Sequence, residues 1–158
     1  MKGIIFMFGL IGILMMGKNG QSDQSQLLLV TARFQSTAAA QAAGYELGPG
    51  PSLCVADLTF GGLGYRYVNP SLVDAQVDFL QPEAMVYITG SNGTLQLGAV
   101  EYIVPVPAWN ASNTRWPQIM GHQFHLNPSL NAYVLHIWVW ENNRAGMFED
   151  WNPKISCP

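Results

Sequence analysis

The stretch that decides the fold is AMVYITGSNGTLQLGAVEYIV, residues 84–104. Residues 84–89 and 94–104 are rich in β-branched and aromatic side chains, which favour strands. The segment SNG at 91–93 lies between them, and Asn-Gly tolerates the positive φ that tight hairpin turns need. The sequence therefore predicts an antiparallel hairpin at the centre of the domain.

Two further segments on either side of this hairpin are predicted strands. YRYV at 65–68 follows a glycine-rich run at 61–64, which indicates a tight or bulged approach to the strand. VLHIWVW at 134–140 carries bulky side chains at every second position and between them. A strand with two apolar faces is typical of a central position covered on both sides.

A helix is predicted over residues 27–43, ahead of all these strands. Apolar side chains recur there at spacings of three or four, no Gly or Pro interrupts the segment, and Gly44 is a natural stop. The loop GPGP at 48–51 follows. The order predicts an α+β fold in which an N-terminal helix packs on a mainly antiparallel sheet with a central hairpin.

Length and composition limit the class of protein. The chain has 158 residues, of which 49% are hydrophobic and 11% charged, and its net charge is -3. This is enough for one globular domain with a hydrophobic core. The few scattered basic residues argue against partners that present phosphates, such as nucleic acid or an anionic membrane surface.

The first residues are typical of an export signal. Met1-Lys2 is a short basic start, residues 3–17 are uncharged and almost wholly apolar, and a polar segment follows at 18–26. We predict a signal peptide at 1–22, a single globular domain at 23–158, and a periplasmic or extracellular location with no membrane span after signal removal. An uncleaved membrane anchor is the alternative, although the apolar run is shorter than a spanning helix needs.

The two cysteines, Cys54 and Cys157, both fall in the predicted exported part. Export places them in an oxidising compartment, where a disulfide between them would persist and would hold the C-terminal tail. A buried free thiol and a reactive thiol are the alternatives.

Candidate metal ligands come from the histidines. The pair His122-x-x-His125, with His136 or Glu101 as a third ligand, would suit zinc or copper. The alternative is a solvated histidine pair in a loop and one hydrogen-bonded histidine in the core.

Glu101 is the one acidic residue inside an apolar strand. A buried carboxylate there is a candidate acid or base. The alternative is a structural ion pair with Arg66 or Arg33. Asp74 and Asp78 form an acidic pair in a predicted loop, where a solvated surface accounts for them.

Four ordered motifs resemble a widespread group of uncharacterised, mostly bacterial, exported proteins. They are GGLGYRYVNPSLVD (61–74), QPEAMVY (81–87), GAVEYIVP (98–105) and YVLHIWVWENNRAGMFEDWNPKISC (133–157). The resemblance implies that the C-terminal tail and the Cys54–Cys157 pair belong to one framework. It also implies histidines at the positions of Arg66 and Ala132 in related proteins, so that of three such histidines this chain keeps His136 alone. The group brings no established activity.

These features favour one function and leave two others open. The first is an exported domain that binds a small ligand or a surface partner without catalysis. The second is a metal-dependent or acid–base enzyme centred on His136 and Glu101, with His122 and His125 as helpers. The third is a structural component of an envelope or matrix. The candidate ligand surface, chosen for its glycine-rich approach and aromatic density, consists of Tyr65, Arg66, Glu101, His136 and Trp138.

Overall fold

The computed structural model of the chain describes residues 19–48 and 54–157. The predicted signal segment lies outside the described residues except for positions 19–22, and so does most of the predicted loop at 48–51. In the described part of the chain, no helix combines the length and the apolar character needed to cross a membrane.

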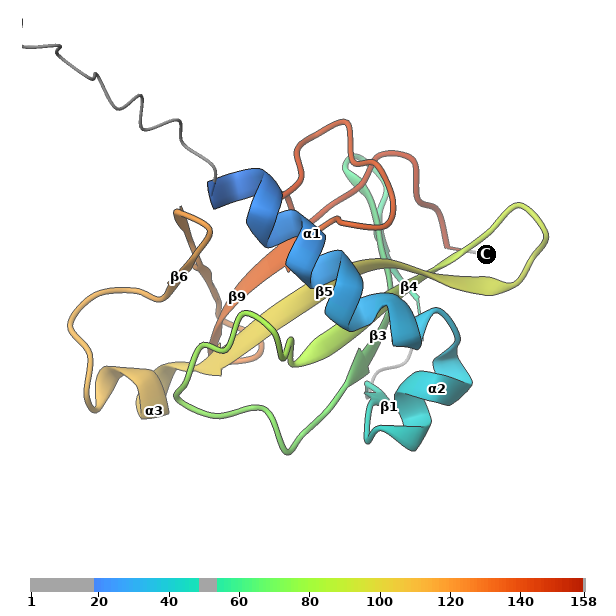
Figure 1. Ribbon diagram of the computed structural model, residues 1–158. Coiled ribbons are helices and arrows are strands. Elements are labelled where there is room, and N and C mark those ends of the chain that lie inside the picture. The colour runs from blue at the N-terminus through green and yellow to red at the C-terminus, as the bar shows by residue number, and fades with distance from the viewer. Residues whose placement is uncertain (1–18, 49–53, 158) are drawn as a thin grey trace, which may run out of the picture.

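The described chain forms helices followed by a mainly antiparallel sheet, which confirms the α+β prediction (Figure 1). The helical elements are α1 (Asn19–Thr31), the 3-10 turn η1 (Ala32–Phe34), α2 (Thr37–Ala42) and α3 (Val106–Asn110). The strands are β1 (Glu46–Leu47), β2 (Val55–Asp57), β3 (Gly61–Val68), β4 (Ala84–Thr89), β5 (Leu95–Pro105), β6 (Gln118–Ile119), β7 (His122–Gln123), β8 (His125–Asn127) and β9 (Ala132–Ile137).

The main sheet has the strand order β1-β3-β4-β5-β9-β8, with β2 paired to β3 as well. Each of these pairs is antiparallel. The predicted hairpin is confirmed at its centre, where β4 pairs with β5 from Ala84↔Glu101 to Thr89↔Leu95. Its turn is closed by a hydrogen bond from the Gly93 amide to the Gly90 carbonyl at 2.9 Å.

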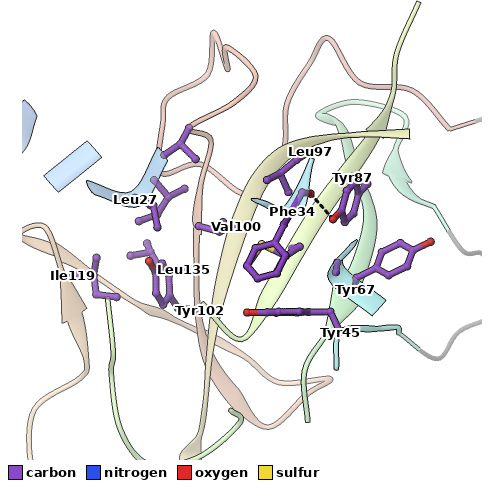
Figure 2. Packing of buried hydrophobic residues seen from close by; sticks show 14 of the residues in the cluster. Leu27, Phe34, Tyr45, Tyr67, Tyr87, Leu97, Val100, Tyr102, Ile119 and Leu135 are labelled. Carbon is purple, nitrogen blue, oxygen red and sulfur yellow. Dashed lines mark hydrogen bonds between the residues drawn. The ribbon is translucent and has the colours of Figure 1, made fainter. Parts of the chain in front are cut away.

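One face of the sheet carries the main hydrophobic core under the helices. Side chains alternate between faces along a strand, and Tyr87, Tyr102 and Leu135 fall on the face that packs with Leu27 of α1. Figure 1 shows α1 lying across this face of the sheet. The Tyr87 hydroxyl donates a 2.6 Å hydrogen bond to the Phe34 carbonyl, drawn as the dashed line in Figure 2.

The predicted continuous helix over 27–43 is wrong, because the chain breaks into α1, η1 and α2. The Tyr87 hydroxyl bonds the Phe34 and Ser36 carbonyls, at 2.6 and 3.2 Å. Ser36 is extended, and its hydroxyl caps α2 by accepting from the Ala39 amide. A tertiary contact thus ends the first helical segment, whereas Gly44 stops α2 as predicted.

The predicted strand over 134–140 is correct up to Ile137, where β9 ends. Its six residues are all buried, as expected for a strand covered on both faces. Beyond it the prediction is wrong, because Trp138 donates its amide to Met147 and Trp140 donates to Gly98. Regular strand pairing stops here because Trp138 bonds the C-terminal tail, while Trp140 still bonds β5 at Gly98 outside the ladder.

The predicted disulfide is confirmed. Cys54 and Cys157 are bonded, their Cα atoms lie 5.6 Å apart, and they are 103 residues apart in sequence. A loop of that length corresponds to about 4–5 kcal/mol of lost denatured-state entropy, before any strain is subtracted. The bond fastens the end of the chain to the start of β2.

Gly64 provides a test of this packing. Its φ is +89°, and a Cβ at this position would overlap the Tyr87 carbonyl oxygen of the neighbouring strand. Gly93 has a similar φ of +77°, but a Cβ there would meet open space. We expect Gly93→Ala to cost about 1–2 kcal/mol from backbone strain alone, and Gly64→Ala to cost clearly more. Denaturant unfolding measures both, and equal losses would contradict the packing described.

Glu83 is a buried acid that the sequence did not single out. It is 2% exposed, and its Oε2 accepts a hydrogen bond from the Ile103 amide at 3.0 Å. Ile103 lies in β5 just past Glu101, where the pairing with β4 ends. Burial raises its pKa from 4.5 to about 8, although that hydrogen bond lowers it. The folded chain therefore favours the neutral acid.

The pH dependence of unfolding tests this assignment. A folded pKa above the unfolded value gives stability that is complete below about pH 4.5 and is lost as the pH rises through about 8. Glu83→Gln keeps the acceptor and removes the charge. We expect the variant to lose less stability than the parent between pH 5 and pH 8 in chemical denaturation. Parallel profiles for the two proteins would refute a buried neutral Glu83.

Candidate functional site

A row of polar side chains crosses the sheet on the face opposite the main core. Arg66 of β3, Glu101 of β5 and His136 of β9 share this face, since Glu101 pairs directly opposite His136. His125 of β8 joins them, because it lies opposite Val134 on the same face. We call Arg66, Glu101, His136, His125 and the tail residue Asp150 the polar row.

Arg66 is the ion-pair partner of Glu101. Its Nη1 donates to Glu101 Oε1 at 3.1 Å and to Oε2 at 3.4 Å. The Glu101 side chain is 0% exposed and the Arg66 side chain 23% exposed. The other partner proposed from the sequence, Arg33, lies over the Phe34 ring instead. Glu101 therefore has the structural pairing that the sequence left open.

His136 lies between two carboxylates. Its Nδ1 is 3.1 Å from Asp150 Oδ1, and its Nε2 is 3.8 Å from Glu101 Oε1. An ionised carboxylate only accepts hydrogen bonds, so Nδ1 is the donor toward Asp150. Nε2 is buried and has no hydrogen-bond partner in the described part of the chain.

Asp150 links this buried histidine to the surface. Its Oδ2 is 2.9 Å from His125 Nε2, and the His125 side chain is 45% exposed. The hydrogen bond to Asp150 raises the pKa of His125, although burial opposes this. Burial alone would raise the pKa of Asp150, but the hydrogen bonds from His125 and His136 outweigh it and hold that pKa well below its usual range.

The structure does not bring every sequence candidate into this row. Tyr65 points to the opposite face, where it packs against the main core. Trp138 is 3% exposed and packs with Val86 and Ile155, and its indole N–H donates to the Glu149 carbonyl at 2.7 Å. Trp138 is thus a buried core residue under the C-terminal tail.

The histidine pair proposed as metal ligands is divided. His122 is exposed and stacks on the Phe148 ring, with centroids 3.5 Å apart, whereas His125 bonds Asp150. Within residues 19–48 and 54–157, no group of three or more His, Cys, Asp or Glu side chains is arranged to hold a metal ion. The zinc or copper site stays a prediction, and the donor set named for it is not assembled here.

A pocket of about 350 Å³ adjoins the row at Arg66. Its floor is the sheet face at Val68, Ile103 and Ala132, and its wall includes Pro70 and Val73 from the loop after β3. Apolar side chains dominate this lining. Its charged residues are Arg66 and the exposed Glu46. Sequence reasoning found Arg66 but missed the pocket, because its lining comes from segments scattered along the chain.

The polar row divides this face into two halves. On one side, Val86, Ala99 and Trp138 are covered by Ile155 of the C-terminal tail. On the other side, Ala132 and Ile103 line the pocket. The half away from the tail therefore carries the pocket.

The chain matches no protein-family model, and neither the curated proteins nor the solved structures include a significant match. The resemblance proposed from the motifs stays a prediction. The two positions where it implies histidines, Arg66 and Ala132, both line the pocket.

Asp150→Asn tests the bond between the tail and the row. The Asp150 carboxylate stabilises the fold above its unfolded pKa near 3.8, and this contribution is lost only as the pH falls through its lower folded pKa. The His125 contribution is full below about pH 6.5 and is lost as the pH rises through its raised folded pKa. We expect the variant to lose about 1–3 kcal/mol, with the largest loss near pH 5–6.

Urea unfolding at a series of pH values measures this difference. Asp23→Asn is the matched control, because it removes the same charge from α1, outside the polar row. A loss that is the same at pH 5.5 and pH 8.5, or one matched by the control, would argue against the His125–Asp150 contact.

Proposed function

We propose that the chain is an exported domain that binds a small, mainly apolar ligand without catalysis. The pocket beside Arg66 carries this proposal. Its volume of about 350 Å³ lies at the lower end of the range of about 300–1,000 Å³ for small-molecule sites. An apolar lining with a few polar groups at one side is typical of such sites.

The pocket is built on rigid elements. Its floor residues belong to β3, β5 and β9, which are held in one hydrogen-bonded sheet through β4. Ala132 and Val134 are 3% and 1% exposed, and they pack with Ile103 in one cluster beneath the site. A ligand would therefore bind a preformed surface and would order little of the protein, which favours affinity.

The disulfide supports export. Disulfides persist in oxidising compartments such as the periplasm and the extracellular space. Cys54–Cys157 closes most of the described chain, so the fold is suited to that setting. The proposed signal at 1–22 and the proposed location rest on this bond and on the apolar leader.

Acid–base catalysis is the second candidate. The observation in its favour is His136 Nε2, which faces Glu101 and has no hydrogen-bond partner among the described residues. A catalytic group must reach its substrate, however, and these two side chains are 2% and 0% exposed. Ligand binding fits this face better than catalysis, because the pocket is mainly apolar whereas His136 and Glu101 are buried.

Probe binding tests the pocket. We expect 1-octanol, titrated into the 13C-methyl-labelled protein, to shift the resonances of Val68, Val73 and Ile103, because these side chains line the site. Val73→Trp should fill the space and weaken binding at least about tenfold, since the apolar surface that the alcohol would bury is then occupied.

Leu58→Trp is the control, because it introduces the same ring at a fully exposed position outside the pocket. This variant should bind octanol as the parent does. Shifts confined to other methyl groups, or full binding by Val73→Trp, would show that the pocket is not a ligand site.

A further inference from the structure

We infer that the ligand is an apolar monocarboxylate whose carboxylate pairs with Arg66 while its apolar part lies on the sheet face. This inference rests on the proposed function and adds the chemical class of the ligand. Three observations carry it: the unused donors of Arg66, the buried anchor that holds this side chain, and the position of Glu46.

The guanidinium of Arg66 has one free edge. It carries five N–H donors in a planar fork. Both hydrogen bonds to Glu101 come from Nη1. The guanidinium makes no other hydrogen bond or ion pair within the described part of the chain, so Nε and Nη2 remain available. These two nitrogens form the side-on edge, which matches the two oxygens of a carboxylate.

Glu101 holds that edge in place. The carboxylate is fully buried on β5, and Arg66 reaches it across β4, which carries the small Ala84 at the position paired with Glu101. A long side chain loses much conformational freedom when it binds an ion, and fixing it beforehand reduces that cost. Arg66 is thus prepared to bind an anion at the edge of the pocket.

Glu46 disfavours additional negative charge on the ligand. It is exposed, it lies opposite Val68 on β1, and it lines the same pocket as Arg66. A second negative charge on the ligand would meet this carboxylate, and like charges repel. The rest of the lining is mainly apolar and offers such a group no cation other than Arg66.

The test compares three probes with the same alkyl chain. Octanoate, 1-octanol and octylammonium are titrated into the oxidised protein at pH 7, below their micelle concentrations, and methyl shifts in the pocket report binding. We expect octanoate to bind about tenfold or more tightly than octanol, because its bonds to Arg66 are charge-assisted. Octylammonium should bind most weakly.

A double variant isolates the anion contact. Arg66→Gln with Glu101→Gln removes both members of the buried ion pair, so that no unpaired buried charge is left to unfold the protein. We expect it to bind octanoate and octanol equally. Arg144→Gln, which removes one positive charge from an exposed position outside the pocket, should keep the preference for octanoate.

The outcomes separate this inference from the proposed function. If octanol binds in the pocket but octanoate binds no tighter, or if octylammonium binds best, the ligand class is wrong and the apolar site stands. If the double variant keeps the octanoate preference, Arg66 is not the anchor and the inference falls. If none of the three probes shifts the pocket methyls, the proposed function and the ligand class both fail.

Discussion

The contact between the C-terminal tail and the backbone of β3 is the constraint on which the candidate site depends. Gly62 and Asn152 exchange two hydrogen bonds, from amide to carbonyl in each direction, at 3.1 and 3.0 Å. A Cβ at Gly61 would overlap the Asn152 carbonyl, so the tail can lie here only against a residue without a side chain. The disulfide then fixes the end of the tail, and the same tail carries Asp150 to His136.

This arrangement explains how charged groups lie on a buried sheet face. Taking one carboxylate out of water is costly unless a partner compensates for it. Glu101 has Arg66, and Asp150 has His125 and His136. One buried polar atom of the row, His136 Nε2, has no hydrogen-bond partner in the described chain. The row ends at two partly exposed side chains, Arg66 and His125, and Arg66 borders the open pocket.

Predictions from sequence were most accurate where the signal is local. The hairpin of β4 and β5 follows from two strand-forming runs and one Asn-Gly turn, and the structure has it at those residues. The same kind of local reasoning gave a wrong prediction for residues 27–43, which do not form one continuous helix. Nothing within residues 27–43 shows that the Tyr87 hydroxyl will bind the carbonyls of Phe34 and Ser36 and break the helix.

The candidate site shows the same limit. Glu101 was found because a charged residue inside an apolar strand breaks the pattern, and His136 because it is one of the chain's three histidines. Arg66 was named as a possible partner of Glu101. Asp150 and Glu46 were missed, because no local sequence pattern marks them. The fold places Asp150 beside His136 and places Glu46 in the same pocket lining as Arg66.

By itself, the sequence determined the α+β class, the central hairpin, the disulfide pairing and two of the buried polar residues, Glu101 and His136. These depend on side-chain periodicity, turn chemistry and the presence of only two cysteines. The separation of Tyr65 from Arg66 follows from the alternation of side chains along a strand. The tertiary structure alone decided which face of each strand turns to the main core and where a pocket forms. Strand register sets the first of these two features, and the path of the tail sets the second. Both arise from contacts between residues far apart in the chain, which a local pattern cannot encode.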